Sequence, residues 1–307
     1  MTACAMTLLA SPDDLPTLRP IARHLRKTAN YDFSDVVLVL DTLPPHPAEK
    51  TAPLICAAAE MLADGEITRL VKLSDQRPSR RWFLEIPRRL RDYRGIPIMG
   101  WIAGIDATDC DYVCHFDSDI LVRTESDFSW VEKAIECLKA DPHALYVAPH
   151  PGPPIPDGRL RTGDWSPTTG QDGHWRFKDF VSRRFVIERR RLAALLPLQP
   201  RHISWKRRLA MYAGGKSSLL TWEEHMAHAV RASPYWGVWL SDSRAWSLHC
   251  PDHGRVWQEN VAALIDAVEP GRYPHGQVGL YDLQLNDWLS MLQLDQPDAV
   301  SEDQAFD

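Results

Sequence analysis

The 307-residue sequence lacks the long apolar runs, the paired cysteines and the excess of positive charge that mark several large classes of protein. No apolar run approaches the roughly 18 residues of a membrane-spanning helix, and residues 1–10 lack the basic start of a signal peptide, so we expect a cytoplasmic protein. The six cysteines include no CxxC pair, which indicates reduced thiols. A net charge of -6 gives no electrostatic footprint for nucleic acid.

Lysine is also scarce in this chain. It occurs 8 times against 27 arginines, a preference that fits a GC-rich bacterial genome and implies no particular chemistry. The composition is otherwise ordinary, with 44% hydrophobic and 25% charged residues, as in soluble globular proteins. The length is sufficient to bury a substantial core.

Strand-like apolar runs alternate with amphipathic helical segments along the first half of the chain, and this alternation predicts an α/β fold with a largely parallel sheet. We expect strands at residues 5–10, 36–40, 66–73 and 111–122, and helices at 11–29, 53–64 and 98–107. After a helix at 130–140 and a strand at 144–148, a loop rich in Pro and Gly extends to about residue 178. Further elements are expected at 180–187 (strand), 188–196 and 223–232 (helices), 235–249 (strand-like), and 256–268 and 281–292 (helices).

The most informative stretch reads Asp-Tyr-Val-Cys-His-Phe-Asp-Ser-Asp-Ile-Leu-Val over residues 111–122. Side chains alternate along an extended strand, so Asp117 and Asp119 are expected to point the same way. Two carboxylates at a strand end suit Mg²⁺ or Mn²⁺, which keep open positions for phosphate oxygens. The alternative is that both aspartates only begin a turn after a buried strand.

Residues 104–119 carry the motif in a wider context, Gly-Ile-Asp-Ala-Thr-Asp-Cys-Asp-Tyr-Val-Cys-His-Phe-Asp-Ser-Asp. This stretch resembles glycosyltransferase family 2, whose members are inverting nucleotide-sugar glycosyltransferases, and the resemblance extends over about residues 5–250. It implies the GT-A fold, a three-layer αβα sandwich with a mixed, mostly parallel central sheet, here with a C-terminal helical extension. The implied divisions are a GT-A domain at 1–255 (nucleotide-sugar half 1–122, acceptor half 123–255), a helical extension at 256–292 and an acidic tail at 293–307 that we expect to be disordered.

The resemblance also implies roles for particular residues. Ala10, Ser11 and Asp41 would hold the nucleotide base and ribose, while Asp117, Ser118 and Asp119 would hold the donor and the metal. The sequence Trp222-Glu223-Glu224 is similar to the family's Glu-Asp motif and implies Glu224 as the catalytic base, with Glu223 in reserve. Glu in the first turn of a helix is also favourable with the helix dipole alone.

Three further kinds of side chain, histidine, arginine and tryptophan, extend this expected site. His249 ends an apolar strand and is expected to approach the metal, as a late histidine does in some GT-A enzymes, with His253 as a weaker candidate; a histidine satisfied at a strand end is the alternative. Trp101-Ile102 stands where the family commonly has Arg-Asn, so the basic contact to the donor must come from elsewhere. Arg77 and Arg81 are the expected donor contacts, and Trp165 and Trp175 the expected acceptor or lid residues.

The sequence therefore predicts a metal-dependent glycosyltransferase that moves a sugar from a nucleotide-diphosphate sugar, with a UDP-sugar favoured, to a hydroxyl of a glycan, lipid-linked or small natural-product acceptor. The basic amphipathic segment 77–94 also fits peripheral contact with an anionic membrane at its inner face. Two alternatives stay open. One is a haloacid-dehalogenase-like phosphatase with Asp117 as nucleophile, and the other is a catalytically silent GT-A-fold glycan-binding or scaffold protein.

Overall fold

The computed structural model describes residues 3–77, 79–85, 90–161 and 167–294. Its strands are β1 (Cys4–Ala10), β2 (Asp35–Leu40), β3 (Arg69–Lys72), β4 (Tyr112–Asp117), β5 (Ile120–Thr124), β6 (Ala144–Ala148), β7 (His150–Pro151), β8 (Thr168–Thr169), β9 (Trp175–Phe177), β10 (Arg184–Glu188), β11 (Trp236–Trp239) and β12 (Ala245–His249). Its α-helices are α1 (Leu18–Ala29), α2 (Ala48–Ala63), α3 (Gly100–Asp106), α4 (Trp130–Ala140), α5 (Arg189–Ala193), α6 (Trp205–Ala213), α7 (Trp222–Arg231), α8 (Arg255–Val268) and α9 (Leu285–Leu294).

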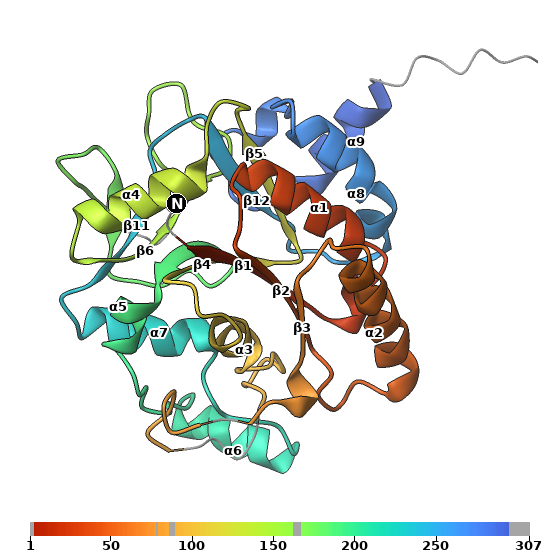
Figure 1. Ribbon diagram of the computed structural model, residues 1–307, viewed down its shortest axis with the longest axis vertical. Helices are drawn as coiled ribbons and strands as arrows, with labels where there is room; N and C mark the ends of the chain where they lie inside the picture. The colour runs from red at the N-terminus through yellow and green to blue at the C-terminus, as the bar shows by residue number, and fades with distance from the viewer. Residues whose placement is uncertain (1–2, 78, 86–89, 162–166, 295–307) are drawn as a thin grey trace, which may run out of the picture.

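The central sheet has the strand order β3-β2-β1-β4-β10-β6-β11-β9-β8 (Figure 1). The first four strands of this order run parallel, and β10 is antiparallel to both of its neighbours. A smaller sheet, β5-β12-β7, lies beside it. The expectation of a mixed, mostly parallel sheet is therefore confirmed.

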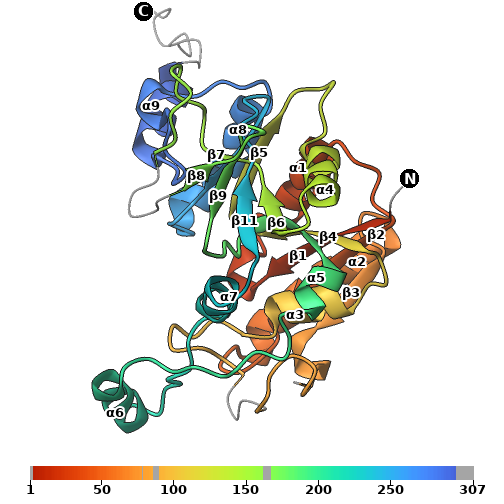
Figure 2. The ribbon, with the colours of Figure 1, turned by 90° about the vertical axis from the view of Figure 1, so that its left-hand side faces the viewer.

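Helices cover both faces of the sheet, because its strands are apolar on both sides. In β2, Val36, Leu38 and Leu40 belong to one buried cluster, and Val37 and Val39 to another. The first cluster is completed by α1, α2, α4, α8 and α9, and the second by α3, α5 and α7 (Figure 2). The three-layer αβα arrangement is confirmed, and the two C-terminal helices share the core of the first layer.

Several element boundaries differ from those expected. The expected strand at 111–122 is broken, because β4 ends at Asp117 and β5 begins at Ile120 in the smaller sheet, so the acidic motif occupies a turn. The strand expected at 66–73 shortens to β3, and α6 was not expected. Residues 295–307, most of the expected acidic tail, lie outside the described residues.

The cysteines carry no disulfide, and four of the six are buried, whereas Cys56 on α2 is exposed. Among the described residues, no helix has the length and apolar character needed to cross a bilayer.

Candidate active site

The register of the parallel strands gathers the expected donor residues at one edge of the sheet. Ala10 pairs with Leu40, and Leu9 pairs with Asp117, so the chain leaves β1, β2 and β4 at the same level. Ligands of open α/β sheets bind outside this carboxyl edge. A cavity of about 530 Å³ lies there, and its lining includes Ala10, Ser11, Asp41, Asp117, Ser118, Asp119, Glu223, His249 and His253.

Asp119 and two histidines form a cluster at one end of this cavity. The Oδ2 atom of Asp119 lies 3.3 Å from Nε2 of His249 and 3.1 Å from Nε2 of His253. The candidate ligand atoms of the three residues all lie within 4.8 Å of one another. The motif turn, the end of β12 and the loop before α8 thus converge on one point, which brings His249 and His253, the two histidines considered from the sequence, beside Asp119.

The donor set of this cluster fits a divalent cation. The Oδ1 atom of Asp119 is buried and has no hydrogen-bond partner among the described residues, although buried polar atoms usually have one. A cation between the carboxylate and the imidazoles would satisfy that oxygen. The mixed oxygen and nitrogen ligands are softer than the all-oxygen set that Mg²⁺ prefers.

Asp117 is held by a neutral histidine from its own strand. His115 Nε2 lies 3.1 Å from Asp117 Oδ1, and its Nδ1 lies 2.8 Å from the Thr7 hydroxyl. Burial lowers the pKa of His115 to about 3, so a neutral imidazole bridges the Thr7 hydroxyl and the Asp117 carboxyl group. Burial and the nearby charge of Asp119 raise the pKa of Asp117 well above its usual range. A cation at this point would reverse that effect.

Asp14 supports the cluster from the first loop. Its Oδ2 atom accepts hydrogen bonds from the backbone N–H and the hydroxyl of Ser11 at 2.6 and 2.7 Å, and its Oδ1 lies 3.7 Å from His253 Nδ1. Burial alone would raise the pKa of Asp14, but the hydrogen bonds from His253 and Ser11 lower it. In turn, Asp119 and Asp14 raise the pKa of His253 to about 10. The Ser11 hydroxyl is thus engaged within the protein.

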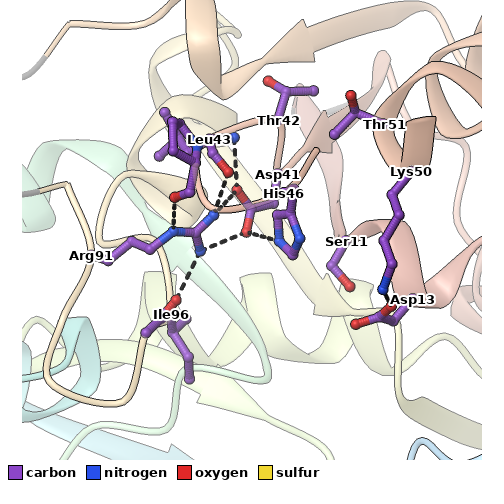
Figure 3. A network of polar contacts seen from close by, with 12 residues as sticks. Ser11, Asp13, Asp41, Thr42, Leu43, His46, Lys50, Thr51, Arg91 and Ile96 are labelled. Carbon is purple, nitrogen blue, oxygen red and sulfur yellow. Dashed lines mark hydrogen bonds and ion pairs between the residues drawn. The ribbon is translucent and has the colours of Figure 1, made fainter. Parts of the chain in front are cut away.

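Asp41 stands at the other end of the cavity, in an ion pair with Arg91 (Figure 3). Both carboxylate oxygens accept from the guanidinium at 2.9 Å, and Asp41 also contacts His46 Nε2 at 3.2 Å and the Leu43 N–H at 3.1 Å. The same guanidinium donates to the carbonyls of Leu43 and Gly95, each at 2.8 Å. The expected ribose-binding acid is therefore already neutralised by an arginine.

The two adjacent glutamates of α7 have different surroundings. Glu224 forms a capping box with Thr221: its Oε2 accepts from the Thr221 N–H at 2.8 Å, and its own N–H donates to the Thr221 hydroxyl at 3.1 Å. Glu223 instead lines the cavity, where its Oε2 accepts from the Ser182 hydroxyl at 2.9 Å. Burial raises the pKa of Glu223. The geometry thus favours Glu223 as a base, although the sequence ranked Glu224 first.

Other expected residues lie away from the cavity. Arg77 donates to the carbonyl oxygens of Ser74 and Gln76, and Arg81 pairs with Asp106 at 3.1 Å. Trp175, in β9, packs against His150 of β7, with ring centres 5.2 Å apart. Trp165 lies outside the described residues. The placement of Arg77, Arg81 and Trp175 does not support their expected contact with donor or acceptor.

Of the residues that the structure describes, three arginines line the cavity in their place: Arg91, Arg94 and Arg183. Arg183 Nη1 lies 3.8 Å from Asp119 Oδ2 and is the basic residue nearest the cluster among the described contacts. Nothing in the local sequence distinguishes Arg91 from the other arginines around it. The capping role of Glu224, by contrast, was readable from the Thr-x-x-Glu spacing of residues 221–224.

No protein-family model matches this sequence, and no curated protein is detectably similar to it. Among solved structures, the fold is similar to that of GalNAc-T7 with UDP, GalNAc and Mn²⁺, at 12% identity and a TM-score of 0.50, over 81% of this chain and 44% of that one. The mannosyltransferase PcManGT from Pyrobaculum calidifontis, in complex with GDP-Man and Mn²⁺, matches at 13% identity and a TM-score of 0.36, over 64% of this chain and 47% of that one. TarS from S. aureus, in complex with UDP-GlcNAc, matches at 12% identity and a TM-score of 0.33, over 64% of this chain and 46% of that one. This chain thus spans less than half the length of the GalNAc-T7 chain. The similarity shows that this chain has the GT-A-type fold that its sequence implied.

Proposed function

We propose that this protein is a metal-dependent glycosyltransferase that takes a sugar from a nucleotide-diphosphate donor and attaches it, with inversion, to an acceptor hydroxyl. The observation that carries the proposal is the meeting of Asp119, His249 and His253 with a separate half-buried carboxylate, Glu223, in one cavity at the carboxyl edge of a GT-A sheet. The fold alone would not support it, because one fold hosts many functions.

Asp119, His249 and His253 are the proposed metal ligands, and Asp117 is proposed to hold the donor beside them. When bound, a divalent cation would stabilise the negative charge that develops on the departing diphosphate. Arg183, 3.8 Å from Asp119, supplies a further positive charge at the same place. We propose Mn²⁺ rather than Mg²⁺ because two of the three ligands are imidazoles.

Glu223 is the proposed general base. Among the other acids of the cavity, Asp41 is paired with Arg91, Asp14 is bonded to Ser11 and close to His253, and Asp92 accepts hydrogen bonds from two backbone N–H groups of its own loop, so their carboxylates are already engaged. Among the described residues, the hydrogen bond that Glu223 accepts comes from a neutral hydroxyl, and burial raises its pKa toward the range that suits proton abstraction near neutral pH. A single base that deprotonates the acceptor is what an inverting displacement needs.

The acceptor is proposed to enter from a second cavity of about 570 Å³ that shares part of its wall with the first. Tyr93, Arg94 and Lys216 line it, and Arg207 of α6 lies over the Tyr93 ring, 6.0 Å from its centre. These cations suit an acceptor with a phosphate or another anionic group. A lipid-linked phosphate is the acceptor class we favour.

Peripheral membrane contact is proposed at the same end of the molecule. Figure 2 shows α6 at one end of the molecule, away from the central sheet. Residues 201–216 contain five lysines and arginines and no acid, in a chain whose net charge is -6. Trp205 on α6 is 68% exposed, and Leu84 is 56% exposed. Basic side chains with exposed apolar ones fit an anionic lipid surface.

The test is a panel of nucleotide-diphosphate sugars incubated with the wild-type protein and Mn²⁺, with release of the nucleoside diphosphate as the measurement. We expect release with one donor, stimulation by the correct acceptor, and loss of release when the metal is chelated. Metal-dependent binding of a donor without turnover would favour the silent scaffold. Trapping of a phosphate on Asp117 would favour the phosphatase, although Asp117 follows β4 rather than the first strand.

A further inference from the structure

The C-terminal segment between α8 and α9 reaches back to the end of β12, where His249 lies. The His249 N–H donates to the Tyr281 carbonyl at 3.0 Å, and the Leu283 N–H donates to the His249 carbonyl at 2.8 Å. Asp282 forms a parallel bridge with His249 between these two bonds. Because β5 pairs with β12 along its other edge, this segment holds the strand end from the open side.

The side chains of the two bridged residues also meet. Asp282 Oδ1 lies 2.6 Å from His249 Nδ1, while Nε2 of the same ring lies 3.3 Å from Asp119 Oδ2. Tyr281 stacks on the imidazole, with ring centres 5.7 Å apart and planes 23° apart. The fully buried Arg184 lies over the Tyr281 ring, 4.0 Å from its centre. The imidazole is therefore fixed by a carboxylate and a stacked ring.

A buried glutamine keeps this segment rigid. The side-chain amide of Gln277 donates to the carbonyls of Leu280 at 2.8 Å and Asp282 at 3.2 Å. Its oxygen accepts from the Gln284 N–H at 2.9 Å and from the indole N–H of Trp288 at 2.8 Å. Gln277 is fully buried, so these bonds have little competition from water. Asp282 is thus presented to His249 from a fixed backbone.

We propose that Asp282 is a positioning residue of the metal centre, through which residues 281–283 of the C-terminal region orient His249 toward the cation. By accepting the Nδ1 proton, Asp282 keeps that proton off Nε2 and leaves the Nε2 lone pair directed at Asp119. A carboxylate behind a metal-binding histidine also makes the imidazole a stronger ligand. The inference rests on the metal centre of the proposed function.

The experiment is a titration of the full chain with Mn²⁺ alone, followed by calorimetry, and it needs no donor or turnover. We expect Asp282→Ala to weaken Mn²⁺ binding by about 10- to 100-fold, and Asp282→Asn to weaken it less because an amide oxygen can still accept from Nδ1. Asp287→Ala is the matched control, an exposed acid on α9 in the same region. It should bind Mn²⁺ as the wild type does.

Two further measurements separate positioning from folding. The Asp282 side chain is 60% exposed, so Asp282→Ala should shift the metal-free melting temperature by no more than about 2 °C. In ¹⁵N spectra at high pH, the proton should lie on Nδ1 of His249 in the wild type and redistribute to Nε2 in Asp282→Ala.

Equal Mn²⁺ affinity of the wild type and Asp282→Ala, together with an unchanged His249 tautomer, would overturn the role of Asp282 alone. Absence of Mn²⁺ binding by the wild type would overturn the metal centre with it, whereas Mn²⁺ binding without sugar transfer would contradict only the proposed function.

Discussion

The two ends of the main cavity carry similar residue types in opposite states. At the arginine end (Asp41, His46 and Arg91), the carboxylate has a bidentate partner, a histidine and a backbone N–H around it. At the acidic end (Asp117, Asp119, His249 and His253), one buried oxygen of Asp119 has no partner among the described residues. At the first end the protein satisfies the carboxylate itself, whereas at the second end a buried carboxylate oxygen is left without a hydrogen-bond donor from the described residues.

This difference shows why an acid at the end of a parallel strand is not by itself a ligand site. Asp41 follows β2 and Asp117 ends β4, the two strands that flank β1 at the same edge, yet an arginine 50 residues along the chain pairs with Asp41. What distinguishes a cation site is a cluster whose own hydrogen bonds leave an oxygen unsatisfied. The predictions below therefore compare the two ends directly.

The largest effect is expected at Glu223, beside the acidic end. Glu223→Gln should lower turnover by about 10²- to 10⁴-fold with nearly unchanged donor affinity, because the amide cannot accept the acceptor proton. Glu224→Gln is the matched control, and it should leave turnover nearly unchanged and keep the capping box, because a glutamine amide oxygen can still accept from the Thr221 N–H. Steady-state kinetics and donor titration measure both. A reversed pattern would restore Glu224 as the base.

The next largest effect concerns metal affinity. Asp119→Ala removes a direct ligand and should weaken Mn²⁺ binding by about 100-fold or more. This loss should exceed the one expected for Asp282→Ala, which removes only a residue that supports a ligand. Asp41→Asn at the arginine end should leave Mn²⁺ affinity unchanged. Calorimetric titration with Mn²⁺ distinguishes them. If both substitutions weakened binding equally, the contrast between the two ends would be wrong.

Substitutions at the arginine end should change the free energy of unfolding rather than the affinity for metal. Arg91→Met leaves Asp41 nearly buried without its charged partner and should lower the free energy of unfolding by about 2 kcal/mol, a value reduced for the partial exposure of Arg91. Adding Asp41→Asn should recover part of the loss, since the unpaired charge is then removed. Urea unfolding measures the whole cycle. Additive effects of the two substitutions would show that the pair is uncoupled.

The pH dependence of turnover gives a smaller effect at the acidic end. Burial raises the pKa of Glu223, so the base is protonated at pH values where an ordinary glutamate is already ionised. Turnover should therefore rise about tenfold per pH unit up to this raised pKa and then level off. The profile of Glu224→Gln should keep this limb. A flat profile from pH 5 upward would exclude Glu223 as the titrating base.

The sequence predicted the features that depend on residues close together in the chain, such as the strands and the acids at their ends. It therefore placed Asp117 at a strand end, and the family resemblance added Ser11 and Asp41 to the same donor site, which the register of the strands brings to one edge. It could not select Arg91 from the surrounding arginines, because that choice depends on where a loop folds back against the end of β2. Asp282 lies 33 residues beyond His249, and no local pattern connects them.

Some features were readable but were not used. Ser204 and Gly214 flank α6 and are typical start and stop residues of a helix, so that helix could have been predicted. Only the structure, however, shows that the C-terminal helices share a core with α1 and α2 rather than forming an appendage.

The smallest predicted effect tests whether the arginine end continues into a membrane-facing surface. The two cavities share Arg91 and Arg94, so the cations around α6 adjoin the arginine end rather than the acidic end. Lys206→Gln should weaken binding to phosphatidylglycerol-containing vesicles by about fivefold, because each basic residue near an anionic surface contributes about 1 kcal/mol. Arg190 is an exposed arginine on α5, and Arg190→Gln should not change this binding.

Co-sedimentation with vesicles measures the difference, with pure phosphatidylcholine vesicles as the uncharged reference. If the protein bound both kinds of vesicle equally, or if Lys206→Gln and Arg190→Gln lost the same amount of binding, the basic surface around α6 would not be a membrane-binding surface. The proposed function would then depend on the donor cavity alone.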